Sequence, residues 1–184
     1  MSEVDGFRSW DDGTIPDVLH QLPPEQQQEL FAWVNAIVSK ETEGLDDLYN
    51  AISMIVKYIP NFMVVPLMVE HIRPKIAAEV CIKMGVDQAT GYANDLPLDY
   101  FSEVASHLEA TMMAQILAKM KRNQVEKFIV LTLKERPTRM LDIAIHLDRP
   151  ILEILAKRIT LPTDESDFAT TPYKAVIDTI RSMQ

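Results

Sequence analysis

Three of the four histidines in this chain occupy the same position of a repeated pattern. Imidazole binds metal ions and exchanges protons near neutral pH, so a recurring histidine could belong to a metal or catalytic site. Three similar segments begin with the histidines at 71, 107 and 146: "HIRPKIAAEVCIKM", "HLEATMMAQILAKM" and "HLDRPILEILAKRI". Either these residues gather around a ligand, or the repeat needs them for folding.

The residues around the histidines follow a twelve-residue apolar period. Steps of twelve from one apolar residue reach the next: Ile72, Met84, Leu96, Leu108 and Met120. Within a unit the fourth, fifth, eighth and ninth following positions are also apolar, as in Met112, Met113, Ile116 and Leu117. At 100° per residue these positions share one side of a helix. The period predicts an all-α fold, a superhelical stack of short (about 12-residue) amphipathic helical repeats.

The ends of these expected helices account for the histidines. Proline stands early in several units, where the first turn of a helix tolerates it. The position before each unit is basic or His in six of eight cases, which places the side chain in the last turn of the preceding helix. A cation there meets unpaired carbonyls and the negative end of the helix dipole. We therefore interpret His71, His107 and His146 as helix-end residues rather than ligands.

The pattern divides the chain into three parts. Residues 1–16 are expected to form a loose acidic segment, residues 17–159 the helical-repeat domain, and residues 160–184 an acidic linker with a C-terminal helix. That last helix should bury Val176, Ile177 and Ile180. Within the repeat domain, residues 35–45, which include "SKETEG", are expected to connect the first unit to the next.

Composition narrows the class of protein. The single cysteine rules out an internal disulfide and favours a cytoplasmic protein in a reducing compartment, and the net charge of −9 disfavours general nucleic-acid binding. No apolar run approaches the ~20 residues that cross a bilayer, and the N-terminus lacks the apolar core of a secretory signal. Neither a Gly-rich phosphate loop nor a Cys/His metal spacing is present, so we expect no enzyme.

Two charged clusters are candidate sites. Four acids stand close together before an apolar segment and could bind Mg²⁺, or simply begin a helix: Glu41, Glu43, Asp46 and Asp47. A basic stripe runs from Lys119 to Arg139 and could meet an acidic partner protein. The contact residues expected in this stripe are Lys119, Lys121, Arg122, Lys127, Arg136 and Arg139.

Three segments resemble the short helices of a known family: "LPPEQQQELFAWV", "IRPKIAAEVCIKM" and "LEATMMAQILAKM". They are similar to the intracellular N-terminal domain of MgtE-type magnesium transporters and to the helical units of the flagellar rotor switch protein FliG. The resemblance covers about residues 22–159 and implies a superhelix of short helices. In the transporters, a CBS pair and a membrane region follow this domain, and acids between the domains bind magnesium. Neither region occurs here, so we expect no ion transport by this chain itself.

These observations lead to three alternatives for function. The first is a non-enzymatic cytoplasmic scaffold or adaptor that binds another protein through the basic stripe. The second, implied by the transporter resemblance, is a magnesium-sensing regulatory module. The third is a nucleic-acid-binding protein, because residues 138–159 have the apolar rhythm of a helix-turn-helix, although the overall acidity disfavours it. A homo-oligomer is compatible with each alternative.

Overall fold

A computed structural model describes residues 19, 21–161 and 172–184. The expected segment 1–16 and the linker residues 162–171 lie outside this range. Every regular element in the described range is a helix, and the described range contains no strand, which confirms the all-α prediction. None of these helices is long and apolar enough to cross a membrane. The chain divides into two compact units, Met1–Leu48 and Tyr49–Gln184.

The first unit contains the helix α3 (Pro24–Glu41), which starts with a proline in its first turn and buries none of its side chains. The connection expected at residues 35–45 is shorter than predicted, because α3 continues through Glu41 and only residues 42–44 precede α4 (Leu45–Val56). Lys40 and Glu41 have high helix propensity and can extend a helix without a buried face. Gly44, at φ 80°, then permits the turn into α4.

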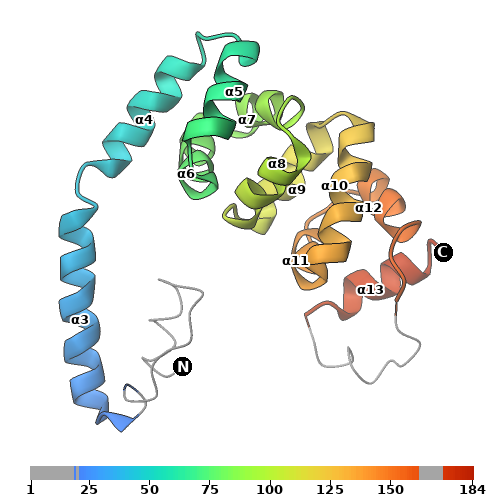
Figure 1. Cartoon of the computed structure of the whole chain (residues 1–184). Helices are drawn as coiled ribbons and strands as arrows, with labels where there is room; N and C mark the ends of the chain where they lie inside the picture. The colour runs from blue at the N-terminus through green and yellow to red at the C-terminus, as the bar shows by residue number, and fades with distance from the viewer. Residues whose placement is uncertain (1–18, 20, 162–171) are drawn as a thin grey trace. The chain divides into compact units, whose positions relative to one another are not determined.

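The second unit consists of the C-terminal part of α4 and a series of short helices (Figure 1). Proline begins several of these helices, at the N-cap of α5 and α8 and in the first turn of α6, α11 and α12, as the sequence predicts. The helices are α5 (Asn61–His71), α6 (Pro74–Met84), α7 (Val86–Ala93), α8 (Leu98–Ser106), α9 (Ala110–Lys119), α10 (Arg122–Glu135), α11 (Pro137–Ala144), α12 (Arg149–Ala156) and α13 (Lys174–Arg181).

The helices of this unit stack in two columns. Helix α5 packs against α7, α7 against α9 and α9 against α11, while α6, α8, α10 and α12 form the other series in the same way. Contacts of α6 with α7 and of α10 with α11 join the columns. Helices α6 and α8 begin 24 residues apart, at Pro74 and Leu98, which is two of the twelve-residue periods. Each turn of the solenoid therefore contains two helices.

The core lies between the columns and uses the positions that the period marks. Met113, Ile116 and Leu117 of α9 are fully buried, as are Phe101 of α8 and Phe128 of α10. The two phenylalanine rings are 5.1 Å apart at their centroids and join consecutive helices of one column. In the C-terminal helix α13, the three buried residues are those predicted, Val176, Ile177 and Ile180.

Side-chain hydrogen bonds also connect helices three apart in the chain. In each case the donor reaches a carbonyl oxygen at or just after the end of the earlier helix, where intrahelical partners run out. The four pairs are Tyr92 Oη with Val56 (2.9 Å), Tyr100 Oη with Ile72 (2.8 Å), Gln124 Nε2 with Asn94 (3.4 Å) and Arg139 Nη2 with Leu108. Burial, with a smaller contribution from Cys81, raises the pKa of Tyr100 to about 12. This side chain therefore donates its hydrogen bond as a neutral phenol well above neutral pH.

Candidate protein-binding surface

The three repeat histidines lie at helix ends, as the sequence predicts. His71 is the last residue of α5, His107 is the C-cap of α8, and His146 follows the C-cap residue of α11. All three are exposed. The described residues contain no group of three or more His, Cys, Asp and Glu that could hold a metal ion. Each of the three histidines thus lies at the C-terminal end of a different helix.

The four acids proposed for Mg²⁺ occupy three different positions at the junction of α3 and α4, and no three of them form a group that could hold a metal ion in the part of the chain that the structure describes. Glu41 ends α3, Glu43 lies in the turn, and Asp46 and Asp47 occupy the first turn of α4. All four are exposed. The two aspartates stand where the helix dipole favours negative charge. The helix dipole is thus a sufficient reason for acidic residues at positions 46 and 47.

Several cations of the basic stripe are engaged within the chain. Lys119 at the end of α9 forms an ion pair with Asp87 at the start of α7. Arg122 contacts Glu126 one turn further along α10, with Nε and Oε1 3.2 Å apart. Exposed ion pairs such as these contribute little to stability, typically under ~1 kcal/mol. They nevertheless reduce the charge that these two residues offer to a partner.

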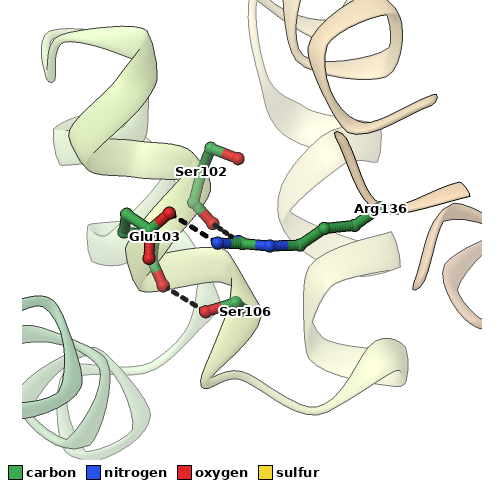
Figure 2. A network of polar contacts seen from close by, with 4 residues as sticks. All are labelled: Ser102, Glu103, Ser106 and Arg136. Carbon is green, nitrogen blue, oxygen red and sulfur yellow. Dashed lines mark hydrogen bonds and ion pairs between the residues drawn. The ribbon is translucent and has the colours of Figure 1, made fainter. Parts of the chain in front are cut away.

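Arg136 and Arg139 connect α11 and its N-cap to α8. Figure 2 shows the Arg136 guanidinium between the carbonyl oxygen of Ser102 (3.4 Å) and the carboxylate of Glu103 (2.5 Å). Arg139 Nη2 donates to the carbonyl oxygens of Ala105, at 3.3 Å, and of Leu108, both at the C-terminal end of α8. Arg139 therefore supplies a donor to carbonyls at the C-terminal end of α8, and Arg136 joins α8 through Ser102 and Glu103. Both arginines thus have contacts within the fold, and their role in partner binding stays a prediction.

The remaining cations of the stripe share the outward face of α10. Lys127 and Lys134 are seven residues apart, which is nearly two full turns, and both are exposed. Val130 lies between them and is 48% exposed, whereas Val125, Phe128, Ile129 and Thr132 point into the core. Neither lysine ammonium has a hydrogen bond or ion pair among the contacts described for this unit. The outward face of α10 therefore has an exposed apolar side chain, Val130, between the two lysine ammonium groups.

Three neighbouring hollows border this face, and Arg158 lines all three of them. Their volumes are about 730, 590 and 250 Å³. Their charged lining contains one carboxylate, Glu126, and five cations: Arg122, Lys127, Lys134, Lys157 and Arg158. Leu98, Leu131, Leu133 and Leu141 form apolar parts of the walls. On a chain of net charge −9, this is a local positive surface with an apolar floor. We call it the α10 surface.

Val130, Lys157 and Arg158 are not among the contact residues expected from the sequence, and Lys134 lies in the predicted basic stripe without being one of the six expected contacts. No periodic signal marks Arg158, because α10 and α12 begin 27 residues apart, at Arg122 and Arg149, and Arg158 lies just after the end of α12. The basic stripe was predicted from residues that are close in the sequence, whereas packing of α12 on α10 brings residues from separate segments onto one surface. Of the six expected contact residues, Arg122 and Lys127 line the α10 surface.

Lys121 lies at the N-cap of α10, and its backbone N–H donates to Asn94 Oδ1 at 2.8 Å. Its exposed side chain remains available at the start of the same helix. The sequence-predicted stripe thus separates into cations that hold helices together and cations around α10 that face solvent. No protein-family model, curated protein or solved structure matches the chain.

Proposed function

We propose that this chain is a non-enzymatic helical-repeat scaffold that binds another protein through the α10 surface. The observation that carries the proposal is the pair Lys127 and Lys134 on either side of the exposed Val130, above hollows with apolar walls. A partner that presents carboxylates around an apolar side chain would match this arrangement. The charges would steer association, and the apolar contact would supply most of the affinity.

The solenoid supports this proposal because it holds α10 rigidly. Four buried residues, Val125, Phe128, Ile129 and Thr132, fix the inner face of this helix, so its outer face is presented without a change in the fold. The resemblance of three segments to the units of FliG, which hold partner proteins, favours the same function. We propose that the scaffold acts in the cytoplasm.

The test uses a photo-crosslinking amino acid at position 130, with position 145 as the matched control. Val130 and Ile145 are similarly exposed, at 48% and 43%, but Ile145 is the C-cap of α11 and lies outside the lining of the α10 hollows. In an extract of the source cells, we expect one protein to crosslink at position 130 and not at position 145. Equal crosslinking at the two positions would contradict the proposed surface.

Charge reversal then separates this surface from general electrostatics. Lys127→Glu with Lys134→Glu should abolish the crosslink at position 130, and Lys121→Glu with Arg122→Glu should weaken it. Arg73→Glu with Lys75→Glu reverses two exposed cations at the start of α6 and should leave it unchanged. If the purified chain instead binds heparin and loses it steeply with salt, while no protein crosslinks, the nucleic-acid alternative replaces the scaffold.

A further inference from the structure

Within the second unit, helix α5 stands at the N-terminal end of the solenoid and leaves its outer side uncovered by the other helices of that unit. Its inner side packs on the core through Val64, Val65 and Met68. At 100° per residue, its other apolar residues form one continuous arc of about 160°. This arc contains Val69 (38% exposed), Phe62 (78%), Pro66, Met63 (51%) and Leu67 (57%). Glu70 is the one charged residue within this arc, and an exposed helix face that is otherwise apolar is normally covered by another element.

An apolar groove adjoins this arc. It has a volume of about 390 Å³ and lies between the end of α4, the Met63 and Leu67 side of α5, and α6. The accessible atoms of its lining are all apolar, and they include Ile72 and Ile76, which are 37% and 36% exposed. Glu70 is the charged residue of the α5 arc, and its carboxylate lies 3.5 Å from His71 Nε2 in the last turn. We call the arc and the groove together the open end.

The opposite end of the solenoid is closed. Helix α13 buries Val176, Ile177 and Ile180 and packs on α12. Its C-terminal Gln184 donates through Nε2 to the carbonyl oxygens of Ala156 (2.8 Å) and Ile159 (2.9 Å). The exposed residues of α13, such as Lys174 and Asp178, are polar. This is what a terminal cap does in a repeat protein, which needs a polar outer face where stacking stops.

We propose that the open end pairs with the open end of a second copy of this chain, which gives a closed dimer. Because the solenoid of the second unit is capped at one end, pairing of two open ends through a twofold axis leaves none for a third copy. The exposed side chains of the arc, with Ile72 and Ile76, present roughly 600 Å² of apolar surface. A standard interface buries ~800 Å² per partner, of which about 450 Å² is apolar. The open end therefore offers enough apolar area for a stable dimer, separate from the α10 surface.

The test is the molar mass of the full chain, measured by light scattering during gel filtration over a range of concentrations. We expect a mass twice that of the 20.9 kDa chain at micromolar concentration. Met63→Glu with Leu67→Glu should give the monomer, because it places two carboxylates in the apolar contact. The control is Ile82→Glu with Ile145→Glu, two residues of similar exposure away from the open end, and it should remain dimeric. Circular dichroism verifies that each variant keeps its helices.

A disulfide experiment locates the contact. Phe62→Cys should crosslink two copies under mild oxidation, since residues near a twofold axis face their own counterparts, and Ile145→Cys should not. The native Cys81 is 5% exposed but lines the groove, so both variants are made in the Cys81→Ser background. A monomer at all concentrations would overturn the proposal, and this includes a monomer whose open end is covered within its own chain. A dimer unaffected by Met63→Glu with Leu67→Glu would overturn it as well, because that dimer uses another surface.

Discussion

The six cations that the sequence assigns to one contact surface should separate into two groups when their charge is removed. Arg139→Met keeps the aliphatic stem but removes the guanidinium that donates to the carbonyls of Ala105 and Leu108. Lys127→Met removes an ammonium that makes no hydrogen bond or ion pair with the residues described around it. We expect the first change to destabilise the fold and the second to leave its free energy of unfolding unchanged.

The contacts of Arg139 set the size of the effect. A hydrogen bond from a charged donor typically contributes ~1.5–3 kcal/mol, and the Leu108 carbonyl would lose the side-chain donor described for it. Arg139 Nε is buried without an acceptor, so its removal relieves one unsatisfied group and lowers the net cost. The expected loss is therefore about 2 kcal/mol. Lys127→Met should stay within about 0.5 kcal/mol, as for most surface changes.

Urea unfolding monitored by circular dichroism measures both variants. With a denaturant slope of ~2 kcal/mol per molar, Arg139→Met should lower the midpoint by about 1 M, and Lys127→Met should leave it in place. Arg136→Met should fall between them, because the ion pair with Glu103 is 36% and 50% exposed at its two side chains. Equal midpoints for Arg139→Met and Lys127→Met would refute the division of the stripe into structural and available cations.

Three further predictions concern a tyrosine, the acids and the core. The raised pKa of Tyr100 means that the unfolded state ionises first, so stability should fall as pH rises from about 10 to about 12. Tyr100→Phe should flatten this fall in urea midpoints, and an unchanged slope would argue against the raised pKa of the half-buried Tyr100 phenol. Thermal melts in EDTA, MgCl₂ and NaCl at equal ionic strength should coincide. A magnesium-specific rise of several degrees, lost when the four acids of the α3–α4 turn become Gln or Asn, would contradict this expectation and favour the cation-sensing alternative. Phe128→Ala should cost ~3–5 kcal/mol because it leaves a cavity beside Phe101, whereas Ile145→Ala should cost under ~1 kcal/mol; similar losses would dispute the position of the core.

Periodicity predicted the helices and most of the residues that they bury at the centre of the stack, but it also marked Ile72, which is 37% exposed, and Met112, which is only partly buried. The pattern around Leu108 marked Met113, Ile116 and Leu117 as core, and all three are fully buried. Helix ends were also predictable, since proline and the histidines are types that helix termini favour. The extent of α3 was missed, because the polar residues at its C-terminal end carry no apolar signal for or against a helix.

The candidate surface was harder to predict than the fold. Lys127 and Arg139 look alike along the chain, but one faces solvent and the other reaches the end of α8. That difference depends on which turn of the solenoid lies beside each residue, information that local sequence does not hold. Arg158 joins the surface because α12, which it follows, packs on α10, a contact between segments that are separate in the sequence.

The two-column stack limits how this chain can change in length. Consecutive helices alternate between columns, so the loss or gain of a single helix would move every later helix into the wrong column and reverse its direction there. An insertion or deletion of 24 residues, the distance from Val86 to Ala110, preserves the alternation. Contacts such as that of Tyr100 with the carbonyl of Ile72 would then be replaced by equivalent ones from the next turn. Relatives of different length are therefore expected to differ by pairs of helices, with the α13 cap retained.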